Sequence, residues 1–124
     1  DVEFVGEDLI PLGSADVLPA VERVRRVEAD LVINTINGST NGPFFAALRD
    51  PARVWAKPVT TLSVSITENE VRGLNPSRLS DDYIAASYFQ TVDRPQSRAF
   101  VARVQAKYGA DRATTDMMAA AYCG

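Results

Sequence analysis

Apolar and polar residues alternate along this 124-residue chain in two periods, which predicts strands interleaved with helices. Four short extended runs are typical of strands, at 2–11, 31–36, 58–64 and 83–89. Apolar spacings of three or four, together with helix-start signals, predict helices at about 17–27, 43–48, 67–73, 95–108 and 116–123, and a loop falls at 75–77. The resulting order of elements is β-α-β-α-β-α-β-α-α.

This order of elements predicts a mainly parallel sheet with right-handed crossovers. We expect residues 1–124 to form one three-layer α/β/α domain around an open sheet of about four or more strands. The run at 31–36 should be covered on both faces, since it is nearly all apolar or β-branched. The expected sheet core is Val5, Leu9, Val32, Ile33, Val59, Leu62, Val64, Ile84 and Phe89.

Several helices carry start signals in the sequence, among them Thr114-Thr115-Asp116 before the last helix. Asn41 is the expected N-cap of the second helix. Two overlapping capping boxes precede the third helix, Ser65 with Glu68 and Thr67 with Glu70. These signals favour a structural role for the four residues, although they do not exclude a role in binding.

Composition and charge exclude several classes of function. The chain has 13 basic and 16 acidic residues, which argues against a nucleic-acid partner recognised by general basicity. Because it contains no histidine, His-based catalytic triads and His-containing metal sites are excluded. The one cysteine cannot form an internal disulfide. No motif for a phosphate-binding loop or a serine hydrolase occurs, and we expect no cofactor and no metal.

Polar, mostly uncharged side chains follow the predicted strands. Open parallel sheets bind ligands beyond the carboxyl ends of their strands, and here that edge comprises residues 11–14, 37–41, 63–68 and 88–91. Neutral amides and hydroxyls suit a small polar ligand with little net charge, and Glu68 is the principal charge among them. A purely structural alternative is that Asn34 and Thr35 satisfy backbone groups and that residues 37–38 form an ordinary turn.

Other polar and apolar residues have simple structural interpretations. Glu7 and Asp8 fit a solvated strand end better than a catalytic pair, although an enzyme using them with Glu68 as acid–base groups is a further hypothesis. Trp55 is expected to pack against the core, as are Met117 and Met118 of the last helix.

Four runs of the sequence resemble the type I periplasmic binding proteins: GEDLIPLGSADV, ADLVINTINGSTNGPFFAALR, KPVTTLSVSITENEVRGL and SYFQTVDRPQSRAFVARVQAKYGADRATTDMMAAAYCG. More narrowly, the sequence resembles the branch of ABC-transporter receptors for urea, short-chain amides and branched-chain amino acids. The resemblance implies a Rossmann-like lobe of a two-lobed protein that closes on its ligand, and this segment is similar to the C-terminal lobe, without the N-terminal one. Implied ligand contacts are Asn37, Gly38, Ser39, Asn41, Ser63, Ser65 and Glu68.

The resemblance also implies partners and a location. A small polar solute and a membrane ABC permease are the expected partners, in an extracytoplasmic setting. A cytoplasmic amide sensor that regulates amidase expression is the alternative within the same branch. Two positions depart from the family, since Gly38-Ser39-Thr40-Asn41 lacks an acidic residue that is often present and Leu9 replaces an aromatic one. Without its partner lobe the chain should expose apolar surface near Met117, Met118, Tyr122 and the first strand, and so self-associate.

Overall fold

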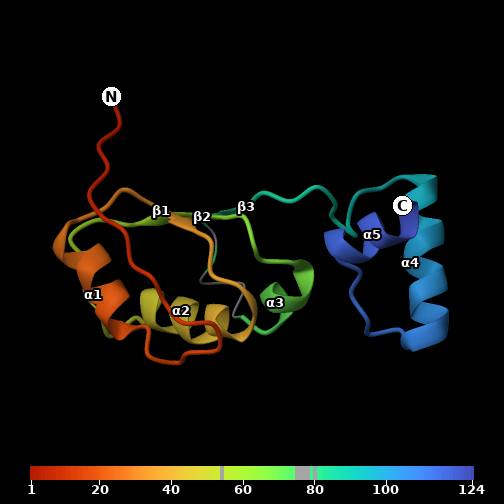
Figure 1. Cartoon of the computed structure of the whole chain (residues 1–124), viewed down its shortest axis with the longest axis horizontal. Helices are drawn as coiled ribbons and strands as arrows, with labels where there is room; N and C mark the ends of the chain where they lie inside the picture. The colour runs from red at the N-terminus through yellow and green to blue at the C-terminus, as the bar shows by residue number, and fades with distance from the viewer. Residues whose placement is uncertain (54, 75–78, 80) are drawn as a thin grey trace.

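The computed structural model describes residues 1–53, 55–74, 79 and 81–124, and the loop predicted at 75–77 lies outside them. The elements in chain order are α1 (Leu18–Arg26), β1 (Leu31–Asn34), the short 3-10 helix η1 (Gly38–Thr40), α2 (Asn41–Leu48), β2 (Thr60–Ser63), α3 (Glu68–Arg72), β3 (Asp82–Ile84), α4 (Pro95–Tyr108) and α5 (Asp116–Cys123) (Figure 1). The mixed α/β class with a parallel sheet and flanking helices is therefore confirmed.

The three strands form a parallel sheet in the order β1-β2-β3. Leu31 of β1 lies opposite Thr60 of β2, and Thr61 lies opposite Asp82 of β3. The carboxyl ends of the three strands consequently meet at one edge of the sheet, as the sequence predicts.

One face of the sheet carries the hydrophobic core. Figure 1 shows α1, α2 and α3 on the same side of the strands. The buried cluster on this side consists of Val17, Val21, Phe44, Phe45, Leu48, Val59 and Ile66. Trp55 is half-buried against this cluster, which confirms its expected packing role.

An ion pair joins α2 to β3 under the sheet. Arg49, the residue after α2, donates from Nε to Asp82 Oδ2 at 3.0 Å and from Nη2 to Oδ1. Thr61 of β2 donates to the same Oδ1 from its backbone N at 3.2 Å and from its hydroxyl at 2.6 Å. The Asp82 side chain is only 7% exposed, so one carboxylate ties together a helix and two strands.

The strand predicted at residues 2–11 does not form, and the sheet has three strands in the described part of the chain rather than four or more. The segment is exposed along nearly its whole length, and the expected core residues Val5 and Leu9 are 49% and 89% exposed. Asp8 pairs with Arg23 of α1 at 3.2 Å, which holds the segment against that helix instead of at the edge of β1. A strand needs a hydrogen-bonded neighbour as well as a suitable pattern.

The second face of the sheet is open, contrary to the prediction that β1 is covered on both sides. Ile33 and Tyr83 are 65% and 64% exposed, and Val64, also expected in the core, is 51% exposed. Val59 is buried as predicted, and Val32, Leu62, Ile84 and Phe89 are half-buried. Because the strands are added in one direction, right-handed crossovers place α2 and α3 on the same face, and no helix among the described residues covers the other.

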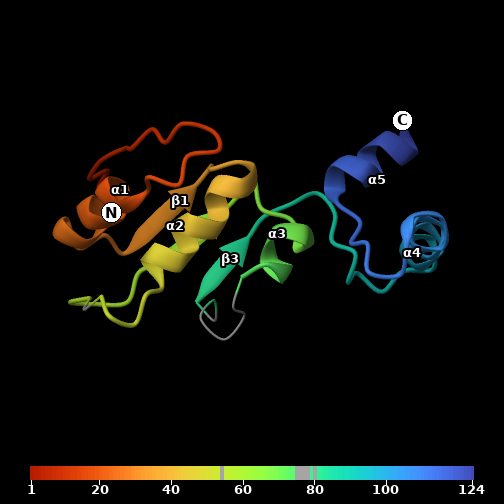
Figure 2. The same ribbon diagram turned by 90° about the horizontal axis from the view of Figure 1, so that it is seen from below.

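The last two helices pack on each other, away from the strands (Figures 1 and 2). Residues 85–94 lead from β3 to α4, and Phe100 and Val104 are the buried residues of α4. Thr115 caps α5 by accepting a hydrogen bond from the Met118 N–H, so the predicted helix start is confirmed. Met117 is 73% exposed and Met118 37%, so their predicted place in the core is wrong: no element of the described part of the chain covers them.

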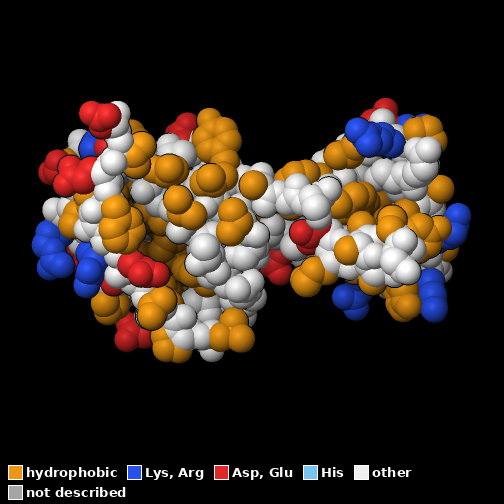
Figure 3. All heavy atoms as spheres, turned by 45° about the horizontal axis from the view of Figure 1, so that its top comes forward, with side chains coloured by type: hydrophobic (Ala, Val, Ile, Leu, Met, Phe, Trp, Pro, Cys, Tyr) orange, Lys and Arg blue, Asp and Glu red, His pale blue; other side chains and the backbone are white. Residues whose placement is uncertain are grey.

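We expect the open sheet face to drive self-association of the chain. The strand residues that point to this side are uncharged, and hydrophobic side chains gather over the strands in Figure 3. Placing a charge on this face, with Ile33→Lys on the edge strand β1, should weaken association by about tenfold or more in light scattering. Val2→Lys, at a fully exposed position outside the sheet, serves as the control. A monomer at high concentration for the unaltered chain would contradict this expectation.

Candidate functional site

Hydrogen bonds join the loops at the carboxyl edge of the sheet into one rim. The Gly13 N–H donates to Thr40 Oγ1 at 2.9 Å, which attaches the segment before α1 to η1. Ser65 Oγ donates to the Ile36 carbonyl at 2.6 Å and joins the loops after β2 and β1. The Thr91 N–H lies 3.4 Å from Glu68 Oε1 and joins the segment after β3 to α3. Segments far apart in sequence therefore meet at the edge where the sequence places a ligand.

A buried amide network supports the rim from below. Asn34, the last residue of β1, is 2% exposed and donates from Nδ2 to Asn41 Oδ1 and to Ser63 Oγ, both at 3.0 Å. Its Oδ1 accepts from the Ile36 N–H at 2.9 Å. Asn34 thus satisfies one backbone group, as the structural alternative expects, and also bonds to two side chains.

Asn41 continues this network toward the loop after β1. It is the first residue of α2 and does not act as the predicted N-cap. Its Nδ2 donates to the Ile36 carbonyl at 2.8 Å and to the Gly38 carbonyl at 3.3 Å. Both polar atoms of the Asn41 amide therefore form hydrogen bonds within the protein. This is possible because η1 precedes α2 and turns the side chain back under the loop.

The seven residues predicted to contact ligand fall into two groups. Asn37, Gly38 and Ser39 are exposed, and Glu68 is half-buried at the start of α3. Asn41 and Ser63 are each 1% exposed and bonded within the network, and the half-buried Ser65 is bonded to Ile36. Thr40, a neutral polar residue of the predicted ligand edge but not one of the seven, is also 1% exposed and accepts from Gly13.

One of the two predicted capping boxes forms at α3. Thr67 accepts from the Asn69 N–H at 3.3 Å, and Glu70 accepts from the Thr67 N–H at 2.9 Å. Ser65 instead bonds to Ile36, which leaves Glu68 outside a capping box. Beside this helix a shallow hollow of about 380 Å³ is lined by Gly38, Ser39, Gly42, Asn69, Glu70, Gly73 and Leu74.

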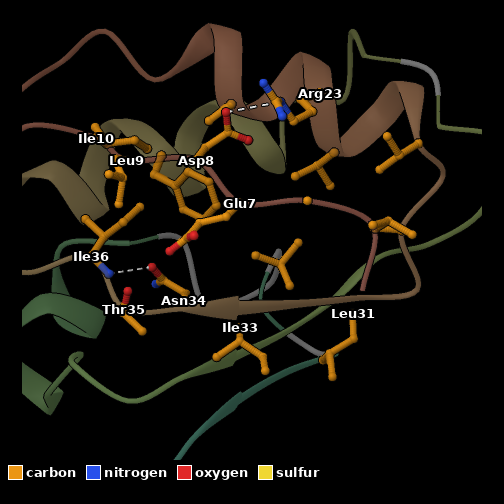
Figure 4. A pocket seen from close by; sticks show the side chains of 18 residues that line it. Glu7, Asp8, Leu9, Ile10, Arg23, Leu31, Ile33, Asn34, Thr35 and Ile36 are labelled. Carbon is orange, nitrogen blue, oxygen red and sulfur yellow. Dashed lines mark hydrogen bonds and ion pairs between the residues drawn. The ribbon is translucent and has the colours of Figure 1, made fainter. Parts of the chain in front are cut away.

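A second hollow, of about 260 Å³, lies between residues 5–10, α1 and β1 (Figure 4). In it Asp8 points toward Arg23, whereas the Glu7 carboxylate points the other way, toward Asn34 and Ile36. The two carboxylates do not face a common point, so their geometry does not support a catalytic pair. Among the described residues no cluster of three or more acidic or cysteine side chains could hold a metal ion.

A family model described as the periplasmic binding protein domain matches residues 1–124. The chain belongs to the periplasmic binding protein family. The match supports the type I proteins, so the resemblance seen in the sequence is confirmed at the level of the family. Periplasmic binding proteins are substrate-binding receptors and not enzymes, which overturns the hypothesis of acid–base catalysis by Glu7, Asp8 or Glu68. In the described ranges no helix is long and apolar enough to cross a bilayer.

Proposed function

We propose that this chain is the ligand-binding lobe of an extracytoplasmic ABC-transporter receptor for a small polar solute such as urea, a short-chain amide or a branched-chain amino acid. The observation that carries the proposal is the rim of mostly uncharged hydrogen-bonding groups, in which the Thr40, Ser65 and Glu68 contacts join four segments of the chain. Membership of a receptor family supports it.

The exposed and the buried residues of the rim have different roles in this proposal. Asn37 and Ser39, with the backbone of Gly38, offer exposed polar groups to a ligand, and Glu68 supplies a carboxylate. Asn41, Ser63 and Ser65 act on the ligand through the loop that they hold in place. A preorganised loop loses less conformational entropy on binding, so the buried amides contribute to affinity without touching the solute.

The proposal also includes a second lobe, which would enclose the solute from the other side. The rim is open to solvent on its outer side, whereas a solute enclosed between two lobes is desolvated and contacted from both. The single lobe should therefore bind solute weakly, and a protein with both lobes should bind it much more tightly. Calorimetry on both forms with urea, acetamide and leucine tests this; no heat from any small polar solute with the two-lobed protein would contradict the proposed function.

Alanine at the exposed rim positions should weaken solute binding. Asn37→Ala and Ser39→Ala are each expected to raise the dissociation constant about threefold to tenfold, because each removes one hydrogen bond. Neither should change the unfolding midpoint, since both side chains are exposed. Arg26→Ala, at the end of α1 near the strand starts, is the control for a surface change away from the rim. Unchanged affinity in both rim variants would remove these residues from the site.

Glu68 distinguishes the classes of solute. An amino acid carries an ammonium group that needs an anionic partner, whereas urea and acetamide do not. With Glu68→Gln, leucine should lose affinity and the neutral amides should keep theirs.

The same rim would serve a cytoplasmic amide sensor, which is the alternative function. The two are told apart by a secretory leader or lipid-anchor cysteine in the protein's complete sequence, which only the receptor requires.

A further inference from the structure

The hollow of about 260 Å³ beside β1 lies between two stretches of extended chain. In Figure 4 residues 7–10 run alongside β1 and in the same direction, with the hollow between them. Residues 5–9 are exposed and belong to no strand, although the pattern of 2–11 predicts one. The hollow therefore separates a strand-like segment from β1, the strand at the edge of the sheet.

The backbone of β1 has bonding groups on the side of the hollow. Among the described residues β2 is the one neighbour of β1 in the sheet. The Thr60 N–H of β2 donates to the Asp30 carbonyl at 3.1 Å. Because alternate residues of a strand in a parallel ladder bond to opposite sides, the backbone groups of Leu31 and Ile33 point away from β2. An edge strand presents such groups as a template for a further strand.

The segment on the other side of the hollow has free backbone groups as well. Within the described part of the chain, the backbone groups of residues 5–10 form no hydrogen bond with another backbone group. The Asp8–Arg23 ion pair, at 3.2 Å, joins this segment to α1. Backbone donors and acceptors without partners therefore flank the same hollow on two sides, and one further strand would satisfy both rows.

Apolar side chains from two helices line the inner wall of the hollow. Ala20, Val24 and Val27 come from α1 and Phe44 from α2, and Ala20 and Phe44 are 7% and 3% exposed. Side chains on one face of an added strand would pack on this wall. Such a strand should be rich in apolar and β-branched residues, as strands inside a covered parallel sheet are.

The open face of the sheet indicates that a helix accompanies this strand. The chain moves from segment 2–11 to β1 in the same direction as from β1 to β3, and α1, α2 and α3 lie on one side of the sheet (Figure 1). A strand in the hollow that leads into segment 2–11 would move in the opposite direction. Since parallel crossovers are right-handed, its helix would lie on the other face, where Ile33 and Tyr83 are 65% and 64% exposed.

We propose that the hollow is the position of a further parallel strand of the same polypeptide, outside residues 1–124, and that the helix after this strand covers the open sheet face. The strand order becomes segment 2–11, added strand, β1, β2 and β3. A second copy of the chain paired edge to edge with β1 would leave the open face uncovered, so it accounts for only one of the two features. The proposal does not depend on which solute the rim binds.

Amide hydrogen exchange followed by NMR, in the chain of 124 residues and in the protein of complete sequence, tests the proposal. The Leu31 and Ile33 amides should exchange at least about a hundredfold more slowly in the complete protein, because the added strand lies against their edge. The Ile84 amide is the matched control. The Ala85 N–H donates to the Ser63 carbonyl of β2 at 2.9 Å, so that of Ile84 faces the outer edge of β3 and should exchange equally in both forms.

Two patterns of exchange would overturn the proposal. Equal exchange of the Leu31 and Ile33 amides in the two forms, or slowing at Ile84 alone, would show that no strand is added beside β1. Protection of Leu31 and Ile33 that rises with the concentration of the 124-residue chain would show instead that a second copy occupies this edge. Solute binding has no part in either readout, so these outcomes are separate from the test of the proposed function.

A proline at the edge of β1 gives a second test. Ile33→Pro removes an N–H that faces the hollow and keeps the bonds to β2, which an edge strand tolerates. It should lower the urea midpoint of the complete protein by about 1 M more than that of the 124-residue chain. Ile84→Pro, the same change at the opposite edge, should shift the two midpoints equally. An equal shift with Ile33→Pro would contradict the added strand, and the exchange experiment decides the matter if a variant does not fold.

Discussion

Asp82→Ala is expected to lower the free energy of unfolding by about 3–5 kcal/mol. The substitution leaves Arg49, whose side chain is 15% exposed, without its carboxylate partner, and it removes the acceptor of two hydrogen bonds from Thr61. A loss of this size is a large share of the total stability of a domain this small. Urea unfolding followed by the fluorescence of Trp55, the one tryptophan, measures it from within the core.

The adjacent aspartate provides the control. Asp81 is exposed and forms no ion pair with the described residues, so Asp81→Ala should change stability by no more than about 0.5 kcal/mol. Similar effects of the two substitutions would show that the Arg49 pair does not hold α2 to the strands.

Asn34→Ala is expected to have the second-largest effect, a loss of about 3 kcal/mol. It deprives Asn41 Oδ1 and Ser63 Oγ of their donor and the Ile36 N–H of its acceptor, and these groups lie where water has little access. Thermal unfolding followed by circular dichroism measures the loss. Solute affinity should fall as well, since the Ile36–Gly38 backbone is positioned from below by this network.

Asn37→Ala is the matched control for the amide at position 34. It removes the same functional group three residues along the chain, where the side chain is exposed. It should weaken solute binding without lowering the melting temperature. A destabilisation by Asn37→Ala equal to that of Asn34→Ala would argue against the division of the rim into contacting and supporting residues.

The parts of the fold that the sequence predicts well are those decided within a few residues. The box formed by Thr67 and Glu70 and the cap at Thr115 depend on groups no more than three positions apart, and both form. The segment at 2–11 has a strand-like pattern, but its conformation depends on whether a distant edge accepts it. Its Asp8 pairs with Arg23 on a helix instead, a contact that no local pattern contains.

The candidate site shows the same division between local and distant information. The order of strands and helices predicts which edge of the sheet gathers the polar loops, because parallel topology alone decides that. It does not predict that Asn37 is exposed while Asn41 is 1% exposed, since both are amides in one turn. Asn41 differs from Asn37 because η1 directs its side chain inward, where Asn34 donates a hydrogen bond to its Oδ1.

The network beneath the loops after β1 and β2 consists of amides, hydroxyls and backbone groups. The side chains of Asn34, Asn41, Ser63 and Ser65 do not ionise between acidic and alkaline solution. Dissolved salt also screens interactions between ions far more than those between neutral dipoles. The shape of this part of the rim should therefore be the same in acidic and neutral solution and at low and high salt concentration.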